Sequence, residues 1–152
     1  MLGGLRNDSK DCGPKRASEY FTSSSTDDCI VQVGAVLKQG DAVMPLETVP
    51  DRDRGYGLLV LYTTPDAAKT TVKTLDAAMI SCRGGAMTAT GSEPKQSPAW
   101  YTYDGRLSAE IPVAQLIVVQ YGNTVTLSSS GSPMAAAPYA AELKKRVDAL
   151  VR

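Results

Sequence analysis

The chain has 152 residues, a length that fits one domain with a core that is stable without metals. Its 16 basic and 16 acidic residues cancel, which argues against binding to nucleic acid or to a membrane surface, because both need a basic excess. The chain contains no histidine, which is the usual general base near neutral pH and the commonest transition-metal ligand. We therefore expect no metal, no cofactor and no catalytic residue.

The sequence shows neither a membrane helix nor a signal peptide. No run approaches the roughly 20 apolar residues that span a bilayer, so we expect no membrane insertion of the domain itself. Residues 1–5 are too short and too polar to be the core of a signal peptide. The first residue is therefore interpreted as following a removed signal, lipid anchor or membrane helix.

The N-terminal part of the chain is polar. Residues 1–27 are rich in Ser, Asp, Lys and Gly, and they are predicted to be a flexible segment that precedes a single domain over residues 28–152.

The apolar stretch at residues 29–37 fits two structures. Ile30, Val33 and Leu37 fall on one helical face, whereas the many β-branched residues of this stretch also suit a strand. A short helix is the preferred interpretation.

The clearest helix signal is Thr64-Pro65-Asp66. A threonine hydroxyl can cap the free amides, proline fits the first helical position, and aspartate suits the positive end of a helix. The helix is predicted to run to about Cys82 and to stop at Gly84-Gly85. Its apolar residues form one narrow seam, with the charged residues lying away from it. The seam residues are Ala68, Val72, Leu75, Met79 and Cys82, and the charged residues are Lys69, Lys73 and Asp76.

The remaining segments predict a sheet and a final helix. A continuous apolar run in residues 56–63 predicts a strand that is central in its sheet. Asp104-Gly105 and Gly122-Asn123 are predicted as hairpin turns, and Pro112 as an interruption between strands. The other expected elements are a short strand at 42–49, a charged turn at 50–55, a loop at 84–98, strands at 100–103, 106–111, 116–121 and 124–128, and a helix at 136–151. Together they predict an α+β fold in which two to three helices pack on an antiparallel sheet of about five to six strands.

The order of several motifs resembles a known family. Asp28-Cys29 is followed by a loop, a strand and a Pro-Asp-Ala-Ala helix that ends at Cys82. The hairpin sequence at residues 118–127 and the helical segment at residues 140–143 then occupy matching places. In order and spacing over roughly residues 28–151, the chain resembles a distant member of the PknH-like extracellular sensor domains of actinobacteria.

That resemblance implies one disulfide. The family usually joins a cysteine near the start of the domain to one at the end of the central helix, which here implies a bond between Cys29 and Cys82. A bridge that closes a loop of about 50 residues stabilises by roughly 3–4 kcal/mol in the chain-entropy model. The sequence departs from the family where many members carry a second disulfide, since residues 113–131 contain no cysteine. It departs again at Met79-Ile80-Ser81, where many members place a tryptophan before the second cysteine.

The resemblance also implies a location and a role. Members of the family are secreted or lipoproteins, and they act outside the cytoplasm in signalling, so the resemblance implies an extracytoplasmic sensor domain. It further implies a sheet with a cleft that binds a ligand, without identifying that ligand.

The aromatic residues Trp100, Tyr101 and Tyr103 are the candidate ligand site. Strand alternation predicts Tyr101 on one face and Trp100 on the other, with Tyr103 on the Trp100 side or at the end of the strand. Such residues could line a possible ligand cleft beside a flexible loop. Ordinary packing in the sheet is the commoner role for a cluster of this kind.

Other candidate groups have stronger ordinary explanations. The mixed charges of residues 51–54 could bind an anion or a partner, although such turns are usually solvated surface. Asp104 and Glu110 could imitate the carboxylate pair of a glycosidase, but surface charges are far commoner. Gly84-Gly85 lacks the sequence context of a phosphate-binding motif.

The third cysteine, Cys12, keeps several possibilities open. It could form an intermolecular disulfide, it could pair with Cys29 or Cys82 instead, or it could be an incidental free thiol. A catalytic role is not expected, because the chain has no histidine to activate a thiol.

These observations lead to one main hypothesis and two alternatives. The main hypothesis is a non-enzymatic extracytoplasmic sensor-like domain that binds a small molecule of the cell envelope or a protein partner. The first alternative is a secreted protein–protein interaction module, such as an inhibitor or an adhesin component. The second is an enzyme that uses carboxylates alone.

Overall fold

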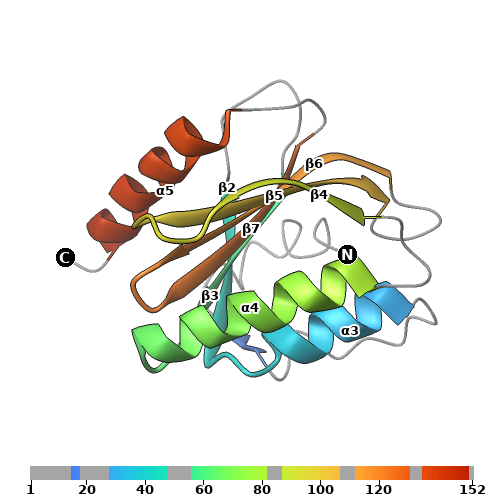
Figure 1. The fold of residues 1–152 in the computed structure, drawn as a ribbon. Helices are drawn as coiled ribbons and strands as arrows, with labels where there is room; N and C mark the ends of the chain where they lie inside the picture. The colour runs from blue at the N-terminus through green and yellow to red at the C-terminus, as the bar shows by residue number, and fades with distance from the viewer. Residues whose placement is uncertain are drawn as a thin grey trace.

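The computed structural model describes residues 15–17, 28–47, 56–81, 87–106, 112–130 and 135–150. Within these ranges, seven strands form one antiparallel sheet in the order β1-β2-β3-β7-β6-β5-β4. Figure 1 shows this sheet between two helical layers, with α3 and α4 on one face and α5 on the other. The strands are β1 (Lys15–Arg16), β2 (Ala42–Glu47), β3 (Tyr56–Leu61), β4 (Met87–Glu93), β5 (Ala99–Arg106), β6 (Pro112–Tyr121) and β7 (Thr124–Ser130), and the helices are α3 (Asp28–Leu37), α4 (Pro65–Ser81) and α5 (Ala136–Leu150).

This arrangement confirms the α+β class. The prediction of about five to six antiparallel strands with two to three helices is met, with β1 as a two-residue extra strand. β1 lies within the segment that was predicted to be flexible, and it pairs with β2. Ala17, directly after it, is fully buried. The domain boundary between residues 27 and 28 stays a prediction.

The helix α4 covers the middle of one face of the sheet. Ala68, Val72, Leu75 and Met79 are each at most 3% exposed, which confirms four positions of the predicted seam. The fifth, Cys82, lies outside the described residues. These four side chains pack with Leu58, Val60, Leu116, Val118 and Val125 of the sheet in the larger of the two core clusters. Fully burying aliphatic side chains of this kind contributes about 1.5–3 kcal/mol each.

The start of α4 follows the prediction. The amide of Ala67 donates to Oγ1 of Thr64 at 3.1 Å, which satisfies one of the free amides in the first turn. Pro65 is the first helical residue and Asp66 lies in the first turn. Threonine, proline and aspartate therefore fix the point where β3 gives way to the helix.

Residues 29–37 are helical, which was the preferred of the two interpretations of this stretch. They lie in α3, which packs beside α4, and Val33 and Leu37 are buried in the same core cluster as the α4 seam. The chain then turns back into β2 at Gly40. A Cβ at this position would collide with Val60 of β3 and would lie 3.2 Å from the carbonyl oxygen of Leu61. A glycine is needed here for the close approach of the two segments.

The strand predicted at residues 56–63 lies inside the sheet, as expected. β3 lies between β2 and β7, and Leu58, Leu59 and Val60 are each at most 7% exposed. The two-residue turn Gly122-Asn123 joins β6 to β7, with Gly122 at a φ of 57°, which confirms the predicted hairpin. The predicted charged turn at residues 50–55 lies mostly outside the described residues.

Three expectations for the second half of the chain are wrong. Part of the predicted loop at 84–98 is the edge strand β4, which pairs with β5 along most of its length. Asp104-Gly105 is not a hairpin turn, because β5 continues through it to Arg106 and Gly105 follows a break in the register with β6. Pro112 does not interrupt a strand but is the first residue of β6, a position where the missing amide of proline is tolerated.

The second face of the sheet is covered by α5. Ile117 and Val119 of β6 pack against Tyr139, Ala140 and Leu143 of this helix, in the smaller core cluster. Of the helical face predicted for residues 136–151, Tyr139, Leu143 and Val147 are each at most 8% exposed. No helix in the described ranges is long and apolar enough to cross a membrane.

Candidate functional site

The predicted aromatic cluster is divided between the two faces of β5. Trp100 packs against the core cluster under α5, together with Ile117 and Val119. Tyr101 and Tyr103 pack against the core cluster under α4. Tyr103 therefore lies on the face of Tyr101, not on that of Trp100 as predicted, because β5 is regular from Tyr101 to Tyr103 and residues two apart share a face.

Tyr103 is anchored to α4 by a hydrogen bond. Its side chain is 1% exposed, and its hydroxyl donates to Oδ1 of Asp76. Burial raises the pKa of Tyr103 far above its ordinary value, and the hydrogen bond to Asp76 raises it further, since ionisation would place two negative charges together. The role of Tyr103 is therefore structural: it joins β5 to the flank of the helix.

Tyr101 differs from Tyr103 because it is only half buried. It packs against the core cluster under α4 and remains partly exposed to solvent. Burial raises the pKa of Tyr101, and the negative charge of Asp76 adds to that effect. An accessible aromatic ring beside a carboxylate offers a ligand both an apolar contact and a polar one.

The flank of α4 next to Asp76 carries three exposed side chains. With 100° of rotation per residue, Lys69, Lys73 and Ile80 fall on the same side of the helix as Asp76, between the buried seam and the outer surface. All three are exposed. Among the large hydrophobic side chains of the described residues, Ile80 stands out because it is 54% exposed. Because Asp76 contacts Tyr103 of β5, this flank is directed toward the edge of the sheet formed by β5 and β4.

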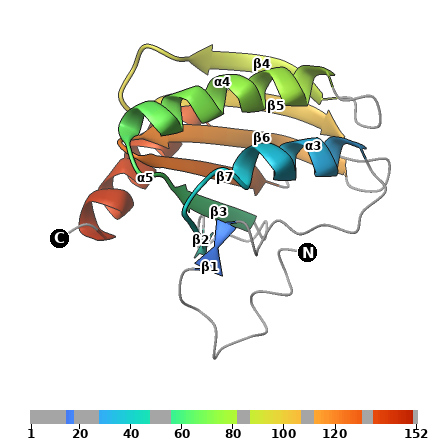
Figure 2. The ribbon, with the colours of Figure 1, turned by 90° about the horizontal axis from the view of Figure 1, so that it is seen from below.

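The strand β4 completes this surface. Ser92 lies opposite Tyr101 and Ala89 lies opposite Tyr103, so both share the face of the two tyrosines, and both are exposed. Figure 2 shows α4 running alongside β4 and over β5 at this end of the sheet, and α4 contacts β4. The name α4–β4 surface is used below for Lys69, Lys73, Ile80, Ala89, Ser92 and Tyr101.

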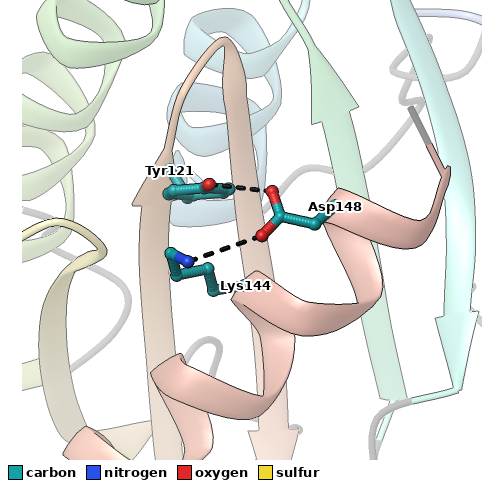
Figure 3. A network of polar contacts seen from close by, with 3 residues as sticks. All are labelled: Tyr121, Lys144 and Asp148. Carbon is teal, nitrogen blue, oxygen red and sulfur yellow. Dashed lines mark hydrogen bonds and ion pairs between the residues drawn. The ribbon is translucent and has the colours of Figure 1, made fainter. Parts of the chain in front are cut away.

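A second polar group lies on the opposite face, between β6 and α5 (Figure 3). The hydroxyl of Tyr121 donates to Oδ1 of Asp148 at 2.8 Å, and Nζ of Lys144 lies 3.4 Å from Oδ2 of the same carboxylate. The ammonium group of Lys144 lies 5.4 Å from the centre of the Tyr121 ring, within the range of a cation–π contact. The hydrogen bond to Asp148 raises the pKa of Tyr121, so this tyrosine is not activated as a nucleophile or base. The group connects α5 to the sheet.

The buried tyrosine at the end of β3 is a third polar feature. Tyr62 is 3% exposed, and within the described ranges its hydroxyl makes no hydrogen bond of acceptable geometry. Burial raises its pKa, with the hydroxyl of Thr71 acting in the opposite direction. Tyr62 lies under α4 and away from the α4–β4 surface, so it belongs to the core.

The other predicted site residues do not come together in the described structure. Asp104 is exposed on β5, and its proposed partner Glu110 lies outside the described residues. The backbone of Cys29 is in α3, but its side chain, together with Cys12 and Cys82, also lies outside them, so the disulfide stays a prediction. The described residues contain no group of three or more Cys, Asp or Glu side chains that could hold a metal ion.

Asp76 is the residue of this site that the sequence did not reveal as such. It was predicted to lie away from the apolar seam of its helix, which is correct, and such aspartates are usually solvated. Its contact with Tyr103 depends on the placement of β5 beneath the helix, 27 residues later in the chain. Two features of the sequence could have indicated the role of Asp76. It lies between the apolar seam and the outer surface of its helix, and the chain contains a tyrosine-rich strand for the helix to pack on.

Comparison with known proteins gives one structural similarity. No family model matches the sequence, and no curated protein matches it. The structure is similar to the crystal structure of the extracellular domain of PknH from Mycobacterium tuberculosis, with 14% sequence identity and a TM-score of 0.46, over 97% of this chain and 89% of that one. At this level the similarity carries no functional assignment, and membership of the PknH-like family stays a prediction.

Proposed function

We propose that this chain is a non-enzymatic, extracytoplasmic sensor-like domain that binds its ligand on the α4–β4 surface. The observation that carries the proposal is the position of Tyr101. Of the three aromatic residues predicted as a ligand site, Trp100 and Tyr101 are both partly exposed, and Tyr101 has in addition a neighbouring carboxylate, that of Asp76. Trp100 packs against α5, and Tyr103 is buried against α4, so both serve the fold that holds Tyr101 in place.

The extracytoplasmic part of the proposal rests on the sequence. It is supported by the order and spacing of motifs that resemble the PknH-like sensor domains and by the implied Cys29–Cys82 bond. A stable disulfide is expected outside the cytoplasm and not inside it. Intact mass under non-reducing conditions, followed by peptide mapping, tests this part. A Cys29–Cys82 bond with a free Cys12 supports it, and three free thiols in protein from an oxidising compartment contradict it.

The non-enzymatic part rests on the available side chains. The chain has no histidine, and the accessible tyrosine of the surface has a raised pKa, which makes it a poorer base and nucleophile at neutral pH. Activity that disappears when Asp104 and Glu110 are both changed to amides would establish the carboxylate enzyme instead.

A thermal-shift experiment tests the binding surface. Soluble peptidoglycan and cell-wall polysaccharide fragments are added to the full chain, and the rise in melting temperature is measured. We expect at least one fragment to raise it, and we expect Tyr101→Ala to abolish that rise. Tyr121→Ala is the matched control, since Tyr121 is a half-buried tyrosine on the opposite face. A rise that survives in Tyr101→Ala and is lost in Tyr121→Ala would move the binding site to the α5 face.

A secreted protein–protein interaction module is the second candidate. It is favoured by the position of β4, the last strand of the sheet, whose outer edge pairs with no strand in the described ranges. The two candidates use neighbouring parts of one surface, and they differ in whether the ligand is a small molecule or a polypeptide.

A further inference from the structure

The outer edge of β4 has features of a strand that can accept a partner. β4 is seven residues long and ends the sheet, so the amides and carbonyls on its outer side are not used by another described strand. Edge strands usually discourage such pairing with lysine, proline or charged side chains. The sequence of β4 is Met-Thr-Ala-Thr-Gly-Ser-Glu, so its devices of this kind are the exposed Glu93 at its end and a bulge between Ala89 and Gly91.

The helix beside this edge runs along it in the opposite direction. β3 ends next to the Gly122-Asn123 turn and leads there into α4. β5 also begins near that turn, and its residue Trp100 pairs with Glu93 at the end of β4. The start of α4 and the end of β4 therefore lie at the same end of the sheet. Asp76 contacts Tyr103, which pairs with Ala89, so the middle of the helix is level with the middle of β4. A strand added outside β4 would therefore pass the whole exposed flank of α4 (Figure 2).

Two lysines of this flank lack ion-pair partners among the described residues, although the exposed Asp66 precedes them on the same side of the helix and Asp76 follows them. Lys69 and Lys73 are exposed and make no ion pair or hydrogen bond within the described part of the chain. The carboxylate of Asp76 already accepts the hydrogen bond of Tyr103. Glu93 of β4 pairs with Trp100 and so belongs to the opposite face of the sheet. The flank thus presents two free cations followed, further along the helix, by the exposed apolar side chain of Ile80.

The spacing of these groups matches an extended polypeptide. Lys69 and Lys73 are one turn apart, about 6 Å along the helix, and Ile80 lies roughly 10 Å beyond Lys73. Alternate side chains of a strand are about 6.6 Å apart on one face. Acidic residues at two successive alternate positions can therefore meet the two lysines, while apolar residues two or four positions away meet Ile80.

A second copy of this chain fits the edge poorly. Two β4 strands related by a two-fold axis would pair antiparallel, with the axis perpendicular to the sheet, so both copies of α4 would lie on the same side. Because the middle of α4 is level with the middle of β4, the axis would pass near Lys73, so the two Lys73 side chains would approach each other and Lys69 of one copy would lie opposite Ile80 of the other. Like charges brought together in this way disfavour the pairing.

From these observations we infer that the ligand of the α4–β4 surface is an extended polypeptide segment, which adds to β4 as an eighth strand. Its side chains on the α4 side are acidic opposite Lys69 and Lys73, and apolar opposite Ile80. Backbone hydrogen bonds to β4 supply the affinity, and the flank of α4 supplies the selectivity. This inference rests on the second candidate function, the protein–protein interaction module, and specifies the partner of the same surface.

The test uses a capped synthetic peptide, Thr-Glu-Thr-Glu-Thr-Val-Thr-Val-Thr, with a fluorescent label, because a strand antiparallel to β4 runs in the direction of α4 and meets the two lysines before Ile80. Its affinity for the full chain is measured by anisotropy, and hydrogen exchange reports protection of the β4 amides. We expect binding, protection of Thr88 to Ser92, and a loss of binding when alternate peptide amides are N-methylated. N-methylation removes the donors that an added strand needs and leaves the side chains in place.

Charge variants make the test selective. The double variant Lys69→Glu with Lys73→Glu should weaken binding of the glutamate peptide about tenfold. The effect is of this size because two charges at the rim of the site are reversed and then repel the glutamates. A peptide with Lys in place of Glu should recover the affinity of this double variant. Lys38→Glu, an exposed lysine at the end of α3, is the matched control and should change nothing.

Four outcomes would overturn the inference. They are no binding of the glutamate peptide, equal binding of its lysine counterpart to the unmodified chain, no effect of N-methylation, or a concentration-dependent dimer whose β4 amides are protected without peptide. If a cell-wall fragment still raises the melting temperature through Tyr101, the proposed function stands while the inference fails. If neither probe binds, both fail.

Discussion

On the α5 face of β5, the partly buried Trp100 packs against a core cluster with Tyr139 and Leu143, and on the α4 face the next residue, Tyr101, is also partly buried and packs against the larger cluster. Each face also has a hydrogen bond from a tyrosine to a helical aspartate. Both bonds are partly buried, but on the α4 face the donor Tyr103 is 1% exposed, while on the α5 face the side chain of Asp148 is 37% exposed and its carboxylate also contacts Lys144.

This difference distinguishes a face that serves mainly to pack a helix on the sheet from a face that is available for binding. The α5 face uses its large aromatic residue for packing and its exposed polar group as a weak connection to the helix. The α4 face fixes the helix with the bond from the buried Tyr103 and leaves a partly exposed aromatic ring, two exposed lysines and an exposed isoleucine beside a strand edge that pairs with no other described strand. A surface that is rigidly supported yet exposed has the properties expected of a binding site.

The largest expected effect contrasts the two adjacent aromatic residues. Trp100→Ala should lower the free energy of unfolding by about 3 kcal/mol, because it leaves a cavity under α5. Tyr101→Ala should lower it by less, about 2 kcal/mol, since its ring is smaller than that of Trp100 and both side chains are only partly buried. Urea unfolding followed by circular dichroism measures both. Equal losses would show that the two faces are not different at this position.

The hydrogen bond from the buried Tyr103 gives the next largest effect. Tyr103→Phe keeps the ring but leaves the Asp76 carboxylate without its donor, so we expect a loss of about 2 kcal/mol in the free energy of unfolding. Tyr101→Phe is the control on the same strand and the same face, and it should cost far less. If both variants unfold alike in urea, the bond between Tyr103 and Asp76 does not hold α4 in place.

Alkaline pH should weaken the same contact. The pKa of Tyr103 is raised in the folded protein from an ordinary value of 10.0, so its contribution is complete below pH 10 and is lost as the pH rises beyond it. Between pH 10 and pH 11 the free energy of unfolding should fall further in the unmodified chain than in Tyr103→Phe, by up to about 1 kcal/mol, because Asp76 is partly screened by solvent. Parallel curves for the two proteins would contradict the assignment.

The smallest effect is expected on the α5 face. Tyr121→Phe removes a hydrogen bond to Asp148, a carboxylate whose side chain is 37% exposed and which keeps its contact with Lys144. The free energy of unfolding should be indistinguishable from that of the unmodified chain, with or without added salt. A loss as large as that of Tyr103→Phe would mean that exposure does not distinguish the two bonds.

The parts of the fold that the sequence predicted correctly have strong local signals. The helix after Thr64-Pro65-Asp66, the central strand β3 and the Gly122-Asn123 hairpin each depend on residues that are close together in the chain. The edge strand β4 was interpreted as a loop, because its Thr, Ser and Gly residues are largely exposed and give no alternation of apolar side chains. Asp104-Gly105 was interpreted as a turn, because the same dipeptide suits both a hairpin and the irregularity that β5 contains.

The candidate site was predictable only in part. Tyr101 was named with Trp100 and Tyr103, but their separation by burial depends on where α4 and α5 pack. Asp76, Lys69 and Lys73 were predicted to lie outside the apolar seam, and only the tertiary arrangement brings their side of the helix next to β4. A surface built from one edge strand and one helical flank has no contiguous sequence motif.

A map of backbone amide chemical shifts tests the central claim most directly. It is recorded on the full chain during titration with whichever probe, the cell-wall fragment or the glutamate peptide, raises the melting temperature most. The account predicts the largest changes at Ala89 to Ser92, at Tyr101 and along the Lys69 to Ile80 flank of α4. Changes centred on Tyr121, Lys144 and Asp148, with β4 unaffected, would contradict it and place the binding surface on the α5 face.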